Sequence, residues 1–170
     1  MHEVGYWEGP IDETSPCRPA SLYGISKNAL RETAALLAGQ HDALLQWIHA
    51  YYIVGDDKFG NSIFSKLLAA AEEGRTTFPF TTGKNRYYFI SVDELARQIA
   101  AIVDQTEVNG VINACTGEPV SLAERVEAYI RDNCLDITLE YGAFPDRPYD
   151  SPGVWGDPTK IRRILASSAS

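Results

Sequence analysis

The chain has 170 residues and a formal net charge of −8 at pH 7, with 45% hydrophobic and 22% charged residues. These values are typical of a globular domain and exclude a disordered tail, while the acidic balance argues against a nucleic-acid partner. No apolar run approaches the roughly 20 residues that span a bilayer, so we expect no membrane segment and a cytoplasmic location. The three cysteines are widely spaced, which predicts free thiols and no metal site.

The first third of the chain predicts a loop, a helix and a strand. Gly-Pro and further prolines make the first twenty residues a loop. Good helix formers with periodic apolar positions predict a helix from about Ser21 to Ala38, ended by Gly39. The run from Leu44 to Val54 is almost continuously apolar, aromatic and β-branched, as expected of a parallel strand buried on both faces.

The remainder of the chain alternates helices with strands. Serine and glutamate at the capping-box spacing predict two helix starts, at Ser91 with Glu94 and at Ser121 with Glu124. The other predicted elements are a helix over 61–73, strands over 76–80, 87–90, 108–114 and 137–141, and a short last helix opened by Asp157. This alternation indicates an α/β architecture. Asp157 has a sufficient explanation as a helix cap, and Lys160 as a solvated or tethering charge.

Tyr23 and Lys27 are the candidate chemical pair. They lie four residues apart in the predicted helix, so they occupy one face about one turn from each other. A phenol with a pKa of about 10 is a poor acid or base at neutral pH, but an adjacent ammonium favours its phenolate form. General acid/base chemistry needs such tuning. An exposed Tyr/Lys pair on an amphipathic helix has the same spacing, so these two residues alone leave both interpretations open.

Five segments form a longer pattern. Pro19 to Lys27 has the form Pro-x-x-x-Tyr-Gly-x-Ser-Lys and resembles the active-site helix of the extended short-chain dehydrogenase/reductases, the NAD-dependent epimerase/dehydratase family. The following segments come in that family's order and at about its spacing: 49–55, 88–95, 113–122 and 147–160. The resemblance extends from about Ile11 to Leu165, nearly the whole chain.

The resemblance implies roles for five residues. Tyr23 would exchange a proton with a sugar hydroxyl or keto group, and Lys27 would support the tyrosine and hold the nicotinamide ribose of NAD or NADP. Tyr51 would border the nicotinamide, and Tyr52 would lie at the substrate contact of the same strand. Arg147 would bind the diphosphate of a nucleotide sugar, a task that suits a guanidinium fork; an exposed loop charge is the equal alternative.

The chain also departs from the family pattern. No Gly-x-x-Gly-x-x-Gly turn is present, and no residue matches the family's catalytic serine or threonine. Tyr52 stands where the family has asparagine, and His49 stands where it has arginine. The resemblance therefore implies an incomplete Rossmann-type parallel sheet without its amino-terminal strands, together with a small mixed substrate subdomain. Residues 1–55 would be the remainder of the dinucleotide-binding domain, and 56–170 the subdomain interleaved with the last Rossmann elements at about 91–134.

The function implied is that of an NAD(P)-dependent oxidoreductase or epimerase acting on a nucleotide-activated sugar. We expect the chain alone to be inactive, or to depend on a partner such as an amino-terminal chain or a second copy in a homodimer. The alternative is a non-catalytic remnant that binds a sugar nucleotide or a partner chain.

Overall fold

The computed structural model describes residues 2–55, 60–146 and 150–168. Its helices are α1 (Leu22–Gln40), α2 (Ile63–Glu72), α3 (Val92–Val103), α4 (Leu122–Asp132) and α5 (Thr159–Ser168). Its strands are β1 (Gly9–Ile11), β2 (Gln46–Ala50), β3 (Tyr52–Val54), β4 (Thr77–Pro79), β5 (Arg86–Tyr87), β6 (Phe89–Ser91), β7 (Gly110–Ala114), β8 (Val120–Ser121), β9 (Thr138–Glu140) and β10 (Gly153–Gly156). The α/β architecture expected from the sequence is confirmed.

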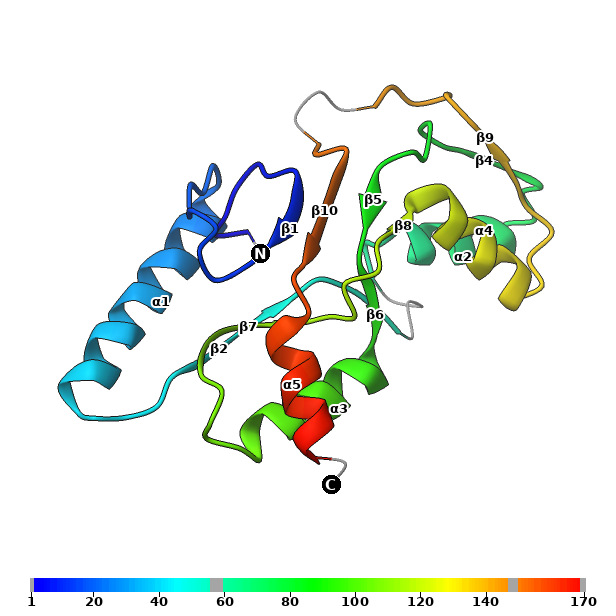
Figure 1. The fold of residues 1–170 in the computed structure, drawn as a ribbon. Coiled ribbons are helices and arrows are strands. Elements are labelled where there is room, and N and C mark those ends of the chain that lie inside the picture. The colour runs from blue at the N-terminus through cyan, green and yellow to red at the C-terminus, as the bar shows by residue number, and fades with distance from the viewer. Residues whose placement is uncertain (1, 56–59, 147–149, 169–170) are drawn as a thin grey trace.

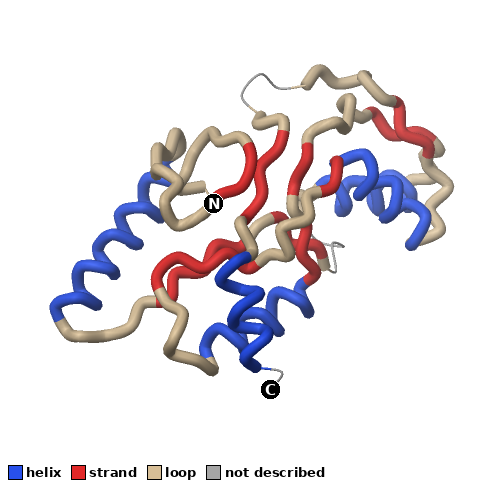
Figure 2. The backbone as a smooth tube through the Cα atoms, viewed as in Figure 1, coloured by secondary structure: helices blue, strands red, loops and turns tan. Residues whose placement is uncertain are grey.

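Most strand pairs are parallel and join segments far apart in the sequence. The order β1-β10-β5-β8 makes the longest sheet, in which only the β5–β8 pair is antiparallel. The pairs β2–β7, β3–β6 and β4–β9 are two-stranded and parallel. Figure 1 shows α3 and α5 side by side below these strands, with α2 and α4 grouped at the other end. Strands and loops fill the centre of the molecule between the helices (Figure 2).

The predicted strand from Leu44 to Val54 is two strands. β2 ends at Ala50 and pairs with β7, whereas β3 begins at Tyr52 and pairs with β6. The expected burial on both faces is wrong for much of the run, because Leu44 and Ile53 are exposed. The apolar composition predicted extended backbone correctly, but it could not show that the run changes partner in the middle.

The helix ends follow local capping chemistry, with two differences from expectation. Ser121 and Glu124 form a complete capping box. At α3, Ser91 accepts from the Glu94 amide, but the Glu94 carboxylate binds Arg97 and Gln98, so only half of that box forms. α1 continues through Gly39 to Gln40, because glycine only weakens a helix and does not by itself end one.

The buried core comprises three apolar clusters. One joins α2, α4, β4 and β9 around Phe64, Leu67, Phe80 and Val126. A second fills the space among α3, α5 and β7, with Ile102, Ile112, Ile161 and Ile164 fully buried. The third surrounds β1, β6 and β10. α4 therefore packs with the predicted substrate-subdomain elements α2, β4 and β9.

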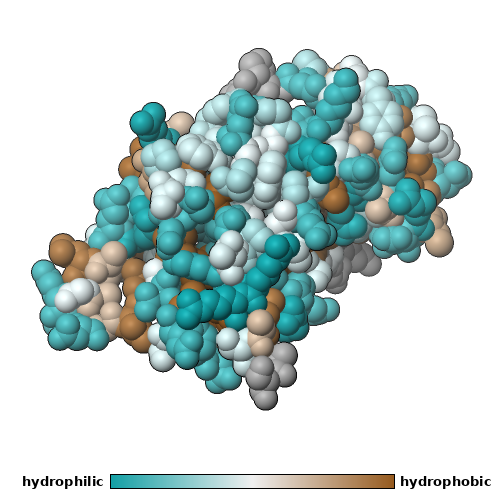
Figure 3. Space-filling model, in the orientation of Figure 1, coloured by the Kyte–Doolittle hydropathy of each residue, from teal (hydrophilic) through white to brown (hydrophobic). Residues whose placement is uncertain are grey.

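α1 differs from the other helices because it buries only Gly24. Its leucines and isoleucine are exposed, among them Leu22, Ile25, Leu30, Leu36 and Leu37. Figure 1 shows α1 standing to one side of the molecule, and Figure 3 shows hydrophobic patches among hydrophilic ones at that end. None of the described helices is both long and apolar enough to span a membrane.

Candidate active site

Tyr23 and Lys27 lie in the first two turns of α1. Ser21 caps the helix by accepting a hydrogen bond from the Gly24 amide. Gly24 is needed at this point because a Cβ would lie 2.4 Å from the His2 carbonyl oxygen and 3.0 Å from the Pro19 side chain. The cap and this close approach set the helix start, and so direct both side chains toward the amino-terminal segment.

The geometry of the pair agrees with the spacing in the sequence. The Lys27 ammonium lies 5.8 Å from the centroid of the Tyr23 ring, within the range of a cation–π contact. His2 packs edge-on against the same ring at 5.3 Å between centroids. Tyr23 is 59% exposed, so a ligand can reach this residue.

Tyr23 and Lys27 line a pocket of about 180 Å³ together with residues of β2 and of the amino-terminal segment. The other lining residues are His2, Glu3, Trp47, Ile48, His49 and Ala50. The pocket brings an exposed phenol and an ammonium next to two buried polar side chains, Glu3 and His49. An arrangement of this kind can exchange a proton with a bound hydroxyl group.

Glu3 and His49 form a buried pair, and sequence reasoning assigned a role to neither. The His49 Nε2 atom lies 2.6 Å from a Glu3 carboxylate oxygen, and both side chains are 4% exposed. The Trp47 indole donates to the other carboxylate oxygen at 3.1 Å. Burial lowers the pKa of His49, and the positive amino terminus adds to this against the opposing attraction of Glu3. His49 was singled out only as a departure from the family motif, and that departure was the available signal.

Tyr51 lies in the core and does not line the Tyr23–Lys27 pocket. It is buried, and its hydroxyl donates to the Asn113 side chain at 2.9 Å. Asn113 in turn donates to the carbonyls of Ile11 and Asp157. Burial raises the pKa of Tyr51, which keeps the phenol protonated. The cofactor role predicted for Tyr51 stays a prediction. In this structure its hydroxyl already donates a hydrogen bond to Asn113.

Tyr52 lies on the opposite side of the chain from Tyr51 and lines a second pocket, of about 510 Å³. Four aromatic side chains line this pocket: Tyr6, Trp7, Tyr52 and Tyr87. The Tyr52 and Tyr87 ring centroids are 4.7 Å apart. Burial raises the pKa of Tyr52, as do Tyr87 and Asp150, so its hydroxyl is a hydrogen-bond donor at neutral pH.

A third pocket of about 570 Å³ adjoins the second, since Tyr87 and Asp150 line both. Its walls are largely apolar and include Phe78, Phe80 and Phe144. Lys66 is the basic residue that lines it in the described part of the chain. Arg147, the predicted diphosphate ligand, lies outside the described residues, as do its next two neighbours.

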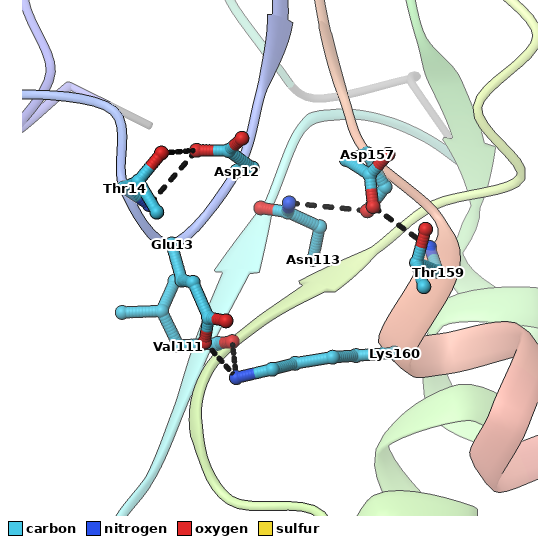
Figure 4. A pocket seen from close by; sticks show the side chains of 8 residues that line it. All are labelled: Asp12, Glu13, Thr14, Val111, Asn113, Asp157, Thr159 and Lys160. Carbon is cyan, nitrogen blue, oxygen red and sulfur yellow. Dashed lines mark hydrogen bonds and ion pairs between the residues drawn. The ribbon is translucent and has the colours of Figure 1, made fainter.

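A further polar pocket, of about 250 Å³, lies between the loop after β1, strand β7 and the start of α5 (Figure 4). Its side chains already satisfy one another. The Lys160 ammonium binds Glu13 and the carbonyls of Asn109 and Val111, and Asp157 accepts from the Thr159 amide. The tethering role expected of Lys160 and the capping role expected of Asp157 are both present. Within the described ranges no cluster of acidic, histidine or cysteine side chains could hold a metal ion.

Comparison with known proteins identifies the family of this fold. Residues 2–115 match the NAD dependent epimerase/dehydratase family. The chain is 45% identical over 157 residues to the dTDP-6-deoxy-L-talose 4-dehydrogenase (NAD(+)) of Aggregatibacter actinomycetemcomitans; the match covers 92% of this chain and 58% of that protein. The chain therefore spans little more than half the length of this curated relative.

Solved structures agree on the fold. A UDP-N-acetylglucosamine 4-epimerase from Methanobrevibacter ruminantium M1 superposes with a TM-score of 0.81 at 19% identity. The superposition covers 96% of this chain and 53% of the epimerase chain. A UDP-glucuronic acid 4-epimerase from Bacillus cereus superposes with a TM-score of 0.78 at 18% identity, over 97% of this chain and 52% of the epimerase chain. The sequence match and the shared fold agree: the chain belongs to the NAD dependent epimerase/dehydratase family.

Proposed function

We propose that this chain carries the acid/base and substrate-binding part of an NAD-dependent oxidoreductase that acts at a ring carbon of a nucleotide-activated 6-deoxy sugar. The observation that carries the proposal is the pocket shared by Tyr23 and Lys27, in a chain 45% identical to a dTDP-6-deoxy-L-talose 4-dehydrogenase. Epimerisation, as in the more distant solved structures, uses the same proton transfer and is the related alternative.

Tyr23 is the proposed acid/base. During oxidation its phenolate takes the proton of the sugar hydroxyl, and in the reverse direction its hydroxyl returns that proton to the carbonyl oxygen. Lys27 assists because a neighbouring ammonium favours the phenolate form. Bound NAD would supply the acceptor for the hydride that leaves the carbon carrying the hydroxyl.

The residues present fit only one end of that cofactor. The Tyr23–Lys27 pocket offers a phenol and an ammonium, which can hydrogen-bond the ribose hydroxyls next to the nicotinamide. Its volume of about 180 Å³ is small for a whole dinucleotide. The glycine-rich turn that binds a pyrophosphate at a helix amino terminus in this fold has no counterpart in the sequence. We therefore propose that this chain binds the nicotinamide-ribose end of NAD, and that a separate amino-terminal unit binds the pyrophosphate.

The two adjoining pockets are the proposed site of the nucleotide sugar. Flat aromatic and apolar side chains pack well against sugar rings and nucleotide bases. We place the sugar in the pocket lined by Trp7 and Tyr52, which shares His2 with the Tyr23–Lys27 pocket. The base then occupies the apolar pocket walled by Phe78 and Phe144. Arg147 remains our proposed diphosphate ligand.

We further propose that an amino-terminal α/β unit covers α1 and extends the sheet beside β2. At 100° per residue, Leu22, Ile25 and Leu36 form one stripe along α1, and Leu30 and Leu37 form another that continues the line of Tyr23 and Lys27. The two stripes together span about 140° of the helix surface, and so broad an apolar face is normally buried against another element. Among the described strands β2 pairs only with β7, which leaves a free edge that such a unit could extend.

A second candidate function is binding without turnover. The exposed side of α1 and the absence of a glycine-rich turn favour it, because both suit a chain that holds a nucleotide sugar or a partner protein but lacks a complete cofactor site.

The proposal is tested by Tyr23→Phe in the chain supplied with the amino-terminal unit, assayed by reduction of NAD with a dTDP-6-deoxyhexose. Loss of an acid/base group should lower kcat by about 10²–10⁴-fold. Tyr141→Phe is the matched control, because Tyr141 is exposed, lines none of these pockets, and its hydroxyl donates to Glu127. Full turnover by Tyr23→Phe would overturn the assignment. Sugar-nucleotide binding without turnover in the parent protein would favour the second candidate.

A further inference from the structure

The pocket lined by Trp7 and Tyr52, where the proposed function places the sugar, has walls made mainly of aromatic rings. The Tyr52 ring packs against Tyr87 at 4.7 Å between centroids and against Phe89 at 5.7 Å. Tyr87 lines the same pocket, whereas Phe89 lies behind it in the neighbouring strand β6. Ring contacts of this kind restrict the orientation of the Tyr52 side chain, so the pocket has a fixed aromatic wall.

The polar side chains around this pocket are already hydrogen-bonded within the protein. The Trp7 indole donates to the Pro10 carbonyl at 2.9 Å, and the Tyr6 hydroxyl donates to a carboxylate two residues along the chain. The Ser151 hydroxyl donates to the Gly153 carbonyl at 3.1 Å and accepts from the amide of the same residue. An indole or a hydroxyl has a single hydrogen to donate. These three side chains therefore have none left for a polar group of a ligand.

The charge of the pocket is negative. Its lining residues in the described ranges include no lysine or arginine, whereas Asp150 carries a carboxylate. Burial lowers the pKa of His2, which keeps that ring neutral at pH 7. Burial, then Tyr87 and then Asp150 raise the pKa of Tyr52, so the Asp150 carboxylate acts on the aromatic wall. A carboxylate on the sugar would therefore meet a like charge without a cation to balance it.

We propose that Tyr52 is a specificity-determining residue: its ring, together with Trp7 and Tyr87, favours a sugar with a methyl group at carbon 6 over one with a hydroxymethyl group or a carboxylate there. The inference rests on the proposed function, which places the sugar in this pocket. Of the three groups, only the methyl needs no hydrogen-bond partner when it is buried. Asp150 adds repulsion against the carboxylate, so the site rejects uronic acids more strongly than hexoses.

The test is titration calorimetry of the 170-residue chain with three dTDP sugars: those of 6-deoxyglucose, glucose and glucuronic acid. The ligands differ only at carbon 6, so the base, the diphosphate and the other hydroxyls contribute equally, and neither cofactor nor turnover is needed. The glucose ligand should bind roughly three- to thirtyfold more weakly than the 6-deoxyglucose ligand, because its extra hydroxyl is only partly satisfied. The glucuronic acid ligand should bind more weakly by at least about a hundredfold.

Three variants locate the source of this preference. Tyr52→Asn removes the ring and supplies a donor and an acceptor, so it should bring the affinities for the 6-deoxyglucose and glucose ligands to about the same value. Tyr52→Phe keeps the ring and should keep the parent ratio. Asp150→Asn should narrow the gap between the glucose and glucuronic acid ligands by roughly three- to tenfold, since it removes the like charge. Tyr141→Asn is the matched control, because Tyr141 is exposed and lines none of the proposed pockets, and it should leave both ratios unchanged.

Equal affinities of the parent chain for the 6-deoxyglucose and glucose ligands would overturn the inference and leave the acid/base role of Tyr23 standing. A parent ratio that persists in Tyr52→Asn would also overturn it. A parent chain that binds none of the three ligands would refute both the placement of the sugar and the specificity that depends on it. Selective binding, lost in Tyr52→Asn, alongside full turnover by Tyr23→Phe would support the role of Tyr52 and refute only the acid/base assignment.

Discussion

The two ends of this molecule use similar helices in opposite ways. At one end α2 and α4 bury Phe64, Leu67 and Val126 against each other and against Phe80. At the other end α1, the longest helix of the described chain, buries only Gly24 and leaves Leu36 64% exposed. The helices α2 and α4 are therefore stabilised by the apolar contacts that they make within this chain. α1 forms through its cap and local propensity, and its apolar residues are available to a partner, so the acid/base residues lie on the less supported part of the fold.

The largest difference between the two ends should appear when one leucine is truncated in each. Leu67 on α2 is fully buried, so Leu67→Ala should lower the free energy of unfolding by about 2–5 kcal/mol. Leu36→Ala on α1 should change it by less than about 0.5 kcal/mol, because its side chain loses few contacts. Chemical denaturation of both variants measures the effect. Equal losses would show that α1 is packed as firmly as α2.

Removing the N-cap of α4 or of α1 should have a smaller effect on stability, and the two effects should differ in kind. Ser121→Ala removes the complete capping box of α4 and should cost about 1 kcal/mol of global stability, since α4 unfolds with the core. Ser21→Ala removes the cap of α1 and should speed amide hydrogen exchange within α1 while leaving the global transition in place. Hydrogen exchange followed residue by residue decides this. A lowered global midpoint for Ser21→Ala would contradict the separation of α1 from the core.

The smallest effect on stability, but the clearest on association, is expected for Leu36→Gln. Replacing an exposed leucine should leave the free energy of unfolding within about 0.5 kcal/mol of the parent. In the isolated chain, where the proposed amino-terminal unit does not cover α1, we expect self-association through α1, and the substitution should reduce it because contiguous exposed apolar patches promote association. Light scattering gives the mass. Val103→Gln is the matched control, since Val103 is 69% exposed at the end of α3, and its mass should not change. Identical masses for parent and Leu36→Gln would argue against α1 as the exposed docking face.

The chemical pair could be found from the sequence because its geometry is local. Two side chains four apart on a helix meet whatever the rest of the chain does, and Tyr23 and Lys27 do so here. The Ser121–Glu124 capping box is local in the same way. Glu3 and His49 could not be paired by such reasoning, because 46 residues separate them and only the folded amino-terminal segment brings the carboxylate to β2.

Tyr51 and Tyr52 show what local sequence determined and what it left to tertiary structure. An apolar, β-branched and aromatic run predicts extended backbone, and in extended backbone neighbouring side chains point to opposite faces. Which face is buried depends on what packs there. β2 pairs with β7 and places Tyr51 against Asn113, whereas β3 pairs with β6 and places Tyr52 in the aromatic pocket. Backbone geometry and caps depend on neighbours within one helical turn, and so the sequence by itself determined the helices, the extended runs that become β2 to β7 and β9, and the Tyr23–Lys27 pair. The first twenty residues were predicted as a loop, yet β1 lies there and pairs with β10, and neither β8 nor β10 was predicted. Strand partners come from segments 35 residues away, as for Arg86 and Ser121, to 145 residues away, as for Gly9 and Val154. Only the tertiary structure decided these partners and the pocket walls.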